Sequence, residues 1–157
     1  MHKRPIFALL VLLSSVLYAQ QTSSKYALVI GNGAYTGLSR LTNPINDADD
    51  MAAALEELGF TVDKVLDGSL DQMENAVMRP KNRLSASDGS YGFFFYAGHG
   101  VQSNGENYLI PIDANIPGEN YLRNRSVSVQ MVLMVNMSTL FYACFVSLYC
   151  LRIYSID

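Results

Sequence analysis

The fold is decided by the stretch Tyr91-Gly92-Phe93-Phe94-Phe95-Tyr96-Ala97-Gly98-His99-Gly100. Its aromatic part has the length and composition of a buried strand, which is bounded by turn residues before it and by a glycine-flanked histidine after it. A strand that ends in Gly-His-Gly places an imidazole at the carboxyl edge of a sheet, where open α/β folds carry their chemistry. On spacing alone, His99 is equally well a turn residue without a chemical role.

Composition narrows the class of protein. The chain has 157 residues, 50% of them hydrophobic, which predicts one folded domain and excludes a disordered chain. The formal net charge is −3, with no basic cluster that could follow a nucleic-acid backbone. The two cysteines lie near the end and form neither a disulfide framework nor a metal-ligand pattern. We therefore expect no nucleic-acid partner, no metal and no cofactor.

The amino terminus has the pattern of a targeting segment. A basic start at Lys3 and Arg4 precedes an apolar run over Ile6 to Leu13, and Ala19 is a small residue at a plausible cleavage point. The sequence therefore predicts a signal peptide over residues 1–19 and an exported protein, periplasmic or extracellular. The alternative is an uncleaved anchor, but the run is well short of the ~18 residues that span a bilayer.

Strands and helices alternate along the middle of the chain. Continuous apolar runs indicate strands buried on both faces, and the helical segments show apolar residues at three- and four-residue spacing. Strands joined through helices predict an α/β fold with a mainly parallel sheet. The expected elements are a strand over 26–30, a helix that begins at Pro44 and ends at Gly59, a strand over 60–66, a helix from about Ser69 that is kinked or broken at Pro80, and the aromatic strand before His99.

A glycine-rich turn follows the first expected strand, at Gly31-Asn32-Gly33. Such a turn can cradle phosphates, as in dinucleotide-binding folds. The next glycine is Gly37, so the G-x-G-x-x-G spacing is absent, and no lysine follows as a P-loop requires. A flavodoxin-like nucleotide binder therefore remains only an outside alternative.

Four ordered blocks carry a resemblance to a known family. The block Tyr96-Ala97-Gly98-His99-Gly100 resembles the histidine motif of the caspase-like cysteine peptidases, which include caspases, metacaspases and bacterial relatives. The other blocks resemble the family's first strand and following loop, its first helix, and the segment that trails the histidine. They are residues 25–32 with Tyr35, residues 41–48 with 55–60, and Tyr108-Leu109-Ile110-Pro111-Ile112-Asp113-Ala114. The resemblance covers about residues 25 to 133.

The resemblance implies a caspase-like three-layer sandwich and a cysteine endopeptidase that acts on protein or peptide substrates. His99 would handle the proton transfers, and the backbone N–H of Gly100 would bind the developing oxyanion. Asp47 would form the pocket for an arginine or lysine before the cut bond, as an acidic residue does in metacaspase-like members. Gly100 also fits a simple turn glycine. Asp47 equally fits a helical first turn, where carboxylates complement the helix dipole.

The carboxyl-terminal part departs from the family pattern. The family has an apolar strand that ends in Asp, a small residue, the nucleophilic Cys and often Arg. In this chain, residues 134–157 form an atypical apolar tail, and no residue from Ser126 to Leu151 is charged. One explanation is a shifted reading frame or an early stop, which would leave the fold incomplete at its C-terminal end. A second is a membrane anchor, because residues 131–151 have the ~20-residue length that spans a bilayer.

A third explanation is a divergent active site. Cys150 follows His99 by about fifty residues, which is close to the caspase spacing, with Phe145 to Leu148 as its strand. Leu148 and Tyr149 replace the expected acidic and small residues, however, and only Arg152 is near enough to lower the thiol's pKa. Cys144 is a weaker candidate. Both cysteines also fit small apolar residues of a hydrophobic segment.

The sequence thus predicts a caspase-like α/β domain of cysteine endopeptidase lineage. His99, Gly100 and Cys150 are the candidate catalytic residues, Asp47 is the candidate substrate-binding residue, and the chain is expected to lack a competent nucleophile. The alternative is a non-catalytic caspase-like module that binds a protein partner or a peptide. The thiol distinguishes the two, because a peptidase without a cysteine beside His99 has no nucleophile.

Overall fold

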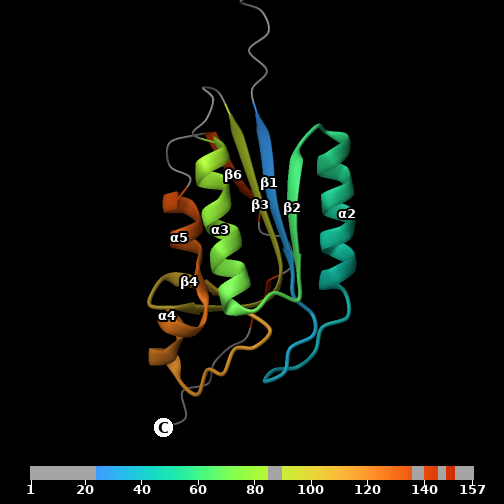
Figure 1. The fold of residues 1–157 in the computed structure, drawn as a ribbon. Coiled ribbons are helices and arrows are strands. Elements are labelled where there is room, and N and C mark those ends of the chain that lie inside the picture. The colour runs from blue at the N-terminus through green and yellow to red at the C-terminus, as the bar shows by residue number, and fades with distance from the viewer. Residues whose placement is uncertain (1–23, 85–89, 136–139, 145–147, 151–157) are drawn as a thin grey trace, which may run out of the picture.

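A computed structural model describes residues 24–84, 90–135, 140–144 and 148–150 of the chain. In these ranges strands and helices alternate around one sheet (Figure 1). The strands are β1 Lys25–Gly31, β2 Thr61–Leu66, β3 Tyr91–Ser103, β4 Glu106–Leu109, β5 Val127–Ser128, β6 Leu140–Cys144 and β7 Leu148–Cys150. The helices are α2 Pro44–Glu57, α3 Leu70–Leu84, α4 Leu122–Arg125, α5 Val129–Val135 and the short 3-10 helix η1 Glu119–Tyr121.

The sheet has the strand order β2-β1-β3-β4-β5, and β6 and β7 both pair with β3. Strands β2, β6 and β7 run parallel to their partners, as does β1 with β3, whereas β4 pairs antiparallel with both β3 and β5. Helix α2 covers one face, and α3 and α5 cover the other (Figure 1). The prediction of an α/β fold with a mainly parallel sheet is confirmed.

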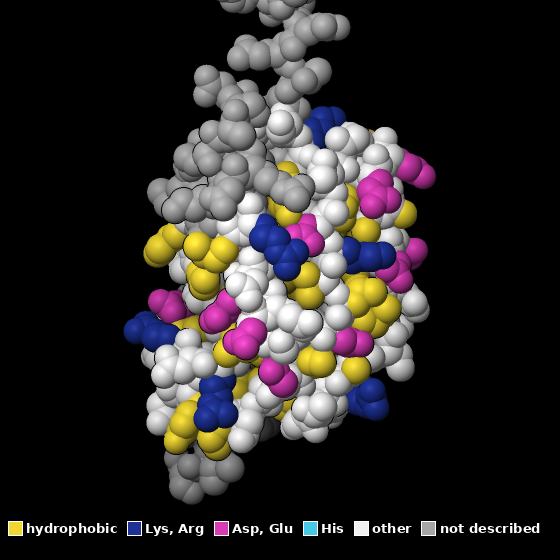
Figure 2. All heavy atoms as spheres, viewed as in Figure 1, with side chains coloured by type: hydrophobic (Ala, Val, Ile, Leu, Met, Phe, Trp, Pro, Cys, Tyr) yellow, Lys and Arg dark blue, Asp and Glu magenta, His cyan; other side chains and the backbone are white. Residues whose placement is uncertain are grey.

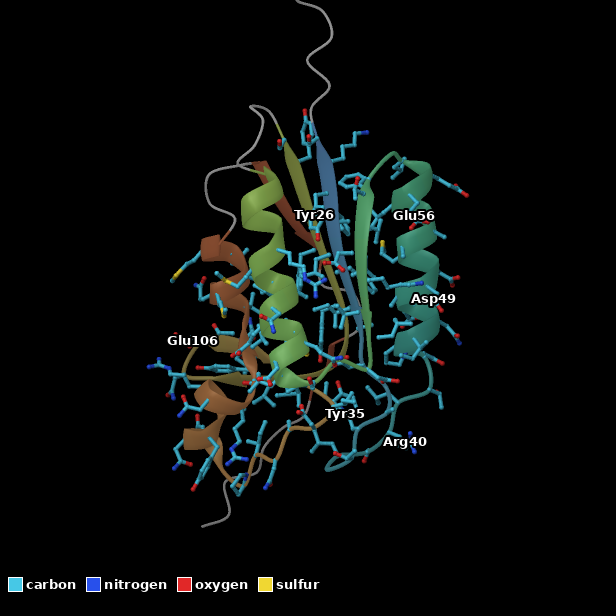
Figure 3. All side chains as sticks on the ribbon, in the orientation of Figure 1. Tyr26, Tyr35, Arg40, Asp49, Glu56 and Glu106 are labelled. Atoms are coloured by element: carbon cyan, nitrogen blue, oxygen red, sulfur yellow. The ribbon has the colours of Figure 1, made fainter. Side chains whose placement is uncertain are left out.

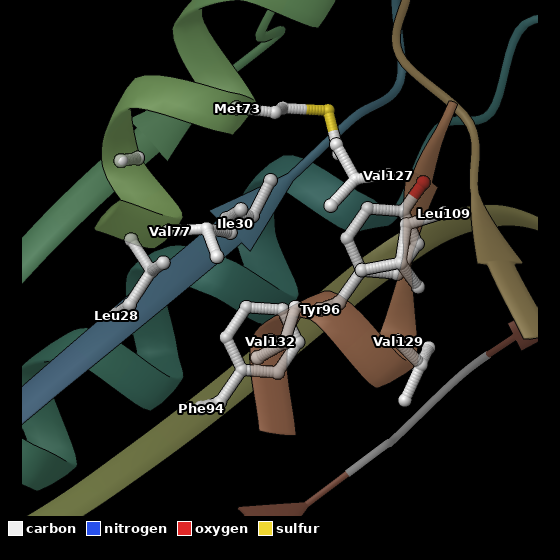
Figure 4. Packing of buried hydrophobic residues seen from close by; sticks show 11 residues of the cluster. Leu28, Ile30, Met73, Val77, Phe94, Tyr96, Leu109, Val127, Val129 and Val132 are labelled. Carbon is white, nitrogen blue, oxygen red and sulfur yellow. The ribbon is translucent and has the colours of Figure 1, made fainter. Parts of the chain in front are cut away.

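Strands β1 and β3 bury side chains on both faces of the sheet. Leu28 and Ile30 of β1 lie with Phe94 and Tyr96 of β3 in the core under α3 and α5 (Figure 4). The alternate residues of both strands pack in a second core under α2, because successive side chains of a strand point to opposite faces. This second core contains Ala27, Val29, Phe95 and Ala97, with Ala48, Ala52 and Leu55 from α2. Two-sided burial explains why these strands read as continuous apolar runs.

The first predicted helix is confirmed in its bounds. Asn43 precedes α2, Pro44 is its first residue, and Gly59 follows its end with a φ of +81°, a conformation that favours glycine.

The second predicted helix differs from the expectation at Pro80. The chain stays helical from Leu70 to Leu84, so the helix is not broken at Pro80, whereas a kink there stays a prediction. Proline has a φ compatible with a helix and removes one backbone hydrogen bond. The buried face of α3, with Met73, Ala76 and Val77, packs on the sheet, and we infer that this packing outweighs the loss.

The aromatic strand is longer than predicted. β3 does not end at the Gly-His-Gly motif but continues to Ser103, and a two-residue turn then leads into β4. Asn104 and Gly105 have φ values of +49° and +79°, as a type I′ hairpin turn requires. The strand instead changes its neighbours at the motif: β1 pairs with it up to Ala97, and β4 pairs with it from Gly100.

The apolar run over residues 131–151 does not form one long helix. Its described parts lie in α5, β6 and β7, and a helix long and apolar enough to cross a membrane is absent from the described ranges. The interpretation as a helical anchor is therefore not supported. α5 begins at Val129, after α4 and β5. Of the strand expected over Phe145 to Leu148, residues 145–147 lie outside the described ranges, and Leu148 is the first residue of β7. Residues 1–19 also lie outside the described ranges.

Charged side chains are interspersed on the surface. Figure 2 shows lysine and arginine among aspartate and glutamate over the visible face. Lys64 of β2 pairs with Asp49 of α2, and Arg79 of α3 pairs with Asp63 of β2, each at 2.6 Å. Such half-exposed pairs contribute about 0–1 kcal/mol each, so they add little to stability beside the two cores.

Candidate active site

His99 lies in β3 just beyond the point where β1 ends, because the last residue of β1, Gly31, pairs with Ala97. Its side chain is buried, with 4% of its surface exposed. The Nε2 atom lies 2.8 Å from the main-chain oxygen of Ser39, in the loop between β1 and α2. A carbonyl oxygen can only accept a hydrogen bond, so Nε2 carries the proton of the neutral ring. The hydrogen bond thereby assigns the tautomer of His99.

The other ring nitrogen of His99 is left as a hydrogen-bond acceptor. Nδ1 is buried and, among the described residues, is the one buried side-chain polar atom without a hydrogen-bond partner. A neutral imidazole that donates from Nε2 has its lone pair at Nδ1. His99 can therefore accept a proton at Nδ1 while Ser39 holds the opposite side of the ring.

Two tyrosine hydroxyls contact the main chain of His99. The His99 N–H donates to the Tyr35 hydroxyl at 2.8 Å, and the Tyr96 hydroxyl donates to the His99 carbonyl oxygen at 2.8 Å. The hydroxyls are 3.2 Å apart. Burial raises the pKa of both Tyr35 and Tyr96, so both stay protonated at neutral pH. Tyr35 lies beyond the carboxyl end of β1, where Figure 3 labels it.

Asn32 forms hydrogen bonds to several segments that surround the histidine. Its side chain is fully buried, and its Oδ1 accepts a hydrogen bond from the Gly68 N–H at 2.9 Å. Its Nδ2 donates to the Ile110 carbonyl oxygen at 3.2 Å, and its own N–H donates to the carbonyl of Ala97 at 2.8 Å. Asn32 thus joins the end of β1 to β3, to the loop before α3 and to the segment after β4.

The glycine-rich turn after β1 has a structural role. The N–H groups of Gly33 and Ala34 both donate to Asp67 Oδ1, at 2.9 and 2.8 Å. A side chain at Gly31 would meet α2, because a Cβ there would lie 2.5 Å from the Pro44 carbonyl oxygen. The donors that would bind a phosphate are therefore already satisfied, which argues against the nucleotide-binding interpretation.

The backbone register places the two cysteines differently. In β7, Tyr149 pairs with His99 and Cys150 pairs with Gly100. In β6, Cys144 pairs with Phe95, four residues before His99. The structure thus brings the main chain of Cys150 beside that of Gly100, as the divergent-site interpretation requires. Whether Cys150 acts as a nucleophile and Gly100 as an oxyanion donor stays a prediction.

Asp47 lies in the first turn of α2, where its N–H donates to the Asn43 carbonyl oxygen at 2.9 Å. This turn packs on the end of β1 that leads toward His99, through Pro44 and Ala48 against Gly31. The Asp47 carboxylate is half-buried and has no ion pair or hydrogen bond within the described part of the chain. Asp49, two residues later, is instead neutralised by Lys64. Whether Asp47 contributes to a substrate pocket stays a prediction.

A separate cleft of about 450 Å³ lies where α3 begins. None of the predicted site residues is among its lining residues, which are Leu70, Pro111, Asp113, Ala114, Asn115, Tyr121, Asn124 and Arg125. The Leu70 N–H donates to the Asp113 carboxylate, so the start of α3 is already capped there. Sequence reasoning did not find this cleft.

Sequence reasoning found His99 and missed the groups that hold it. The Ser39 contact is made by a main-chain carbonyl, which leaves no trace in residue type. Tyr35 and Asn32 lie in the first block of the family resemblance, so their presence was noticed but their contacts were not. From the sequence, Tyr96 was interpreted only as an aromatic residue of the strand. The one available signal was that these three residues carry polar groups within or just after the apolar strands, because buried polar groups need partners.

The fold and the histidine motif define the class of this protein. The chain matches the caspase domain family over residues 24–145 and belongs to that family. The match includes Asp47, His99, Gly100 and Cys144, and it ends before Cys150. The α/β sandwich is accordingly the caspase-like fold that the sequence predicts.

Two curated relatives carry similar sequence. The chain is 35% identical over 109 residues to mucosa-associated lymphoid tissue lymphoma translocation protein 1 of Homo sapiens, which covers 69% of this chain and 13% of the relative. The Mus musculus homolog is 35% identical over the same length, or 12% of that protein. The matched segment is therefore about an eighth of the length of these relatives.

Proposed function

We propose that this domain is a caspase-like cysteine endopeptidase, a hydrolase that acts on protein or peptide substrates. One observation carries the proposal: His99 is buried with Nε2 on the Ser39 carbonyl and with Nδ1 left as an acceptor. In the proposed reaction, Nδ1 takes the proton of a cysteine thiol, and the thiolate attacks the carbonyl carbon of the substrate. The same proton then passes to the leaving amine, and water releases the acyl group.

The oxyanion of this reaction needs a donor, for which we propose the N–H of Gly100. Gly100 is buried next to His99 and follows it directly in β3. A preorganised backbone N–H in a site that excludes water stabilises the charge that develops on the carbonyl oxygen.

We propose Cys150 as the nucleophile position, because its main chain pairs with Gly100. The residues before it weaken the site, since Leu148 and Tyr149 stand where the family has an acidic and a small residue. We therefore propose that the chain as it stands lacks a competent nucleophile. The test is labelling of the purified protein by a thiol-reactive peptide, compared between the parent and the His99→Ala variant.

A second candidate function is a non-catalytic caspase-like module that binds a protein partner or a peptide. The altered residues before Cys150 favour it, because a binding surface does not need an activated thiol. Cys144 is preceded by Ala143, a small residue, but Tyr142 stands in the acidic position. A chain that stays unlabelled after both positions are restored to the family pattern would support the binding module.

We propose that Asp47 selects arginine or lysine before the cut bond, through a charge-assisted hydrogen bond. In a chain with restored activity, reporter peptides with arginine or lysine at that position should be cleaved in preference to those with aspartate. Asp47→Asn should reduce kcat/KM for the basic peptides about 10- to 100-fold, which corresponds to about 1–3 kcal/mol.

Asp49→Asn is the matched control for this prediction. It removes a carboxylate from the same helix, but one that Lys64 already neutralises, so the preference should not change. If the Asp47→Asn variant cleaves basic peptides as well as the parent, Asp47 has no role in substrate selection and only complements the helix dipole.

We propose that the protein is exported through its basic and apolar amino terminus. Expressed in a bacterium, the chain should lose its first ~19 residues. The measurement is the intact mass of the mature protein or its terminal sequence. A mature chain that still begins at Met1 would contradict cleavage and favour an uncleaved anchor.

A further inference from the structure

The main chain of His99 lies between two buried phenol groups that come from different elements. Tyr35 follows β1 and is 3% exposed, and Tyr96 belongs to β3 and is fully buried. The Tyr35 hydroxyl accepts the His99 N–H, and the Tyr96 hydroxyl reaches the His99 carbonyl oxygen, each at 2.8 Å. The His99 carbonyl oxygen also accepts the Ile110 N–H at 3.0 Å, so both backbone groups of His99 are hydrogen-bonded and each has a tyrosine hydroxyl as a partner.

One arrangement of the hydroxyl hydrogens closes these contacts into a ring. Each hydroxyl has one hydrogen to donate. The Tyr96 hydrogen goes to the His99 carbonyl oxygen, and the Tyr35 hydrogen goes to the Tyr96 oxygen at 3.2 Å. The His99 N–H then closes the ring on the Tyr35 oxygen. Successive hydrogen bonds of this kind strengthen one another, because each polarises the next.

The competing acceptor near the hydroxyls has another donor. The Ile110 carbonyl oxygen lies 2.9 Å from the Tyr96 hydroxyl and 3.2 Å from the Tyr35 hydroxyl. It also receives the Nδ2 donor of Asn32 at 3.2 Å. Asn32 occupies one of the two lone pairs of this oxygen, which limits its competition for the hydroxyl hydrogens of the ring around His99.

Gly98 admits the two hydroxyls. A Cβ at this position would lie 2.6 Å from the Tyr35 hydroxyl and 2.6 Å from the Tyr96 hydroxyl, closer than real Cβ contacts. Its φ of +157° also lies outside the range that other residues favour. The glycine before the histidine is thus explained by the ring of hydrogen bonds that it accommodates.

Tyr35 also contacts the imidazole itself. The ring centroids of Tyr35 and His99 are 4.5 Å apart, with planes inclined at 55°. Such tilted aromatic pairs are favourable. Tyr35 therefore restrains the backbone of His99 through its hydroxyl and the imidazole through its ring, while Ser39 holds Nε2.

We propose that Tyr35 and Tyr96 are a coupled pair of positioning residues, which hold His99 with Nε2 on the Ser39 carbonyl and Nδ1 free to accept a proton. The pair acts on the proton-transfer group through its main chain and does not touch the substrate. The catalytic consequence rests on the proposed peptidase function. The positioning itself does not, because it is a property of the folded chain with or without a nucleophile.

The test measures directly which ring nitrogen of His99 carries the proton. The chain has two histidines, His2 and His99, so the His2→Gln variant shows one imidazole in nitrogen-15 NMR. At a pH where the ring is neutral, the parent should show one tautomer with its proton on Nε2. Tyr35→Phe or Tyr96→Phe should give a mixture of tautomers. The His99 amide should exchange with solvent about 10- to 100-fold faster, as expected for the loss of a buried partner.

Coupling gives a second expected result. Because either change opens the ring, the Tyr35→Phe/Tyr96→Phe double variant should accelerate exchange little more than the more severe single variant. Tyr26→Phe is the matched control. It also removes one hydroxyl hydrogen bond from a buried tyrosine, to Asp63 at the opposite end of β1, and should leave the His99 signals unchanged.

A single Nε2–H tautomer with parental amide exchange in either folded phenylalanine variant would overturn the proposal. The test therefore still decides if one of the two variants does not fold. Failure of the peptidase proposal would give a different result. No cysteine would be labelled by the thiol-reactive peptide, even with the family pattern restored, but the His99 signals would still respond to the phenylalanine variants as expected. In a chain with restored activity, the phenylalanine variants should lower kcat and leave KM unchanged, because positioning acts on the proton transfer.

Discussion

A thiol-reactive peptide with arginine before its reactive group should not label this chain in a His99-dependent way. A cysteine nucleophile must be held close to productive geometry and must have a lowered pKa. Leu148 and Tyr149 are large apolar residues where the family has an acidic and a small one, and the tail supplies no charge before Arg152. Parent and His99→Ala should therefore react equally slowly. The measurement is the mass of the labelled protein and of its cysteine peptides over time.

Restoring the family pattern should reverse this result. Leu148→Asp with Tyr149→Ala gives Cys150 the acidic and small residues before it, and labelling should rise about 100-fold or more and require His99. A parallel variant, Tyr142→Asp with Phe145→Arg, does the same around Cys144. His99-dependent labelling of Cys150 in the parent would contradict the prediction and establish a divergent active pair. The restored cysteine that reacts would identify the nucleophile position.

The strands and helices from β1 to β3 could be predicted because their signals are local and agree with one another. Two-sided burial makes β1 and β3 continuous apolar runs, and Pro44 and Gly59 mark the ends of α2. The error at Pro80 has the opposite origin. A single proline is a strong local signal, and the burial of α3 against the sheet, which the local sequence does not show, overrides it.

The course of β3 past His99 was predictable in part. The Asn104-Gly105 pair is the usual sequence of a two-residue hairpin, and the segments beside it form β3 and β4. The prediction nevertheless ended the strand at the Gly-His-Gly motif, whereas β3 continues to Ser103. The pairing of β6 and β7 with β3 could not be predicted, because non-local pairing depends on which strand edge is free.

The environment of the site was the part that sequence reasoning missed. His99 stands out as a histidine between glycines, whereas its tautomer depends on the main chain of Ser39, sixty residues earlier. Tyr35 is also distant in sequence from His99 and contacts it only in the fold, where Asn32 reaches the neighbouring Ile110 carbonyl oxygen. These contacts join three loops at one edge of the sheet. A site of this kind is a property of topology, so one sequence read in isolation shows its central residue and not its support.

Asn32→Ala should be the most destabilising polar change in the site. The amide is fully buried, and its loss leaves the Gly68 N–H and the Ile110 carbonyl oxygen without their Asn32 partner. The unsatisfied Gly68 N–H costs about 1–3 kcal/mol and the lost bond to Ile110 about 1 kcal/mol, so we expect a loss of about 3 kcal/mol in the free energy of unfolding. Asn46→Ala, at an exposed position of α2, is the control and should stay within about 0.5 kcal/mol of the parent.

The measurement is urea unfolding at constant pH, in which a lower midpoint with an unchanged slope reports a loss of stability alone. Asn32→Ala should also disturb His99, although no hydrogen bond joins the two side chains in the described part of the structure. With Asn32 gone, the Ile110 oxygen competes for the hydroxyl hydrogens of Tyr35 and Tyr96, which lie within 3.2 Å of it. The variant should therefore show a destabilised fold together with a mixed His99 tautomer. A stable variant with a single Nε2–H tautomer would mean that Asn32 supports neither the fold nor the site.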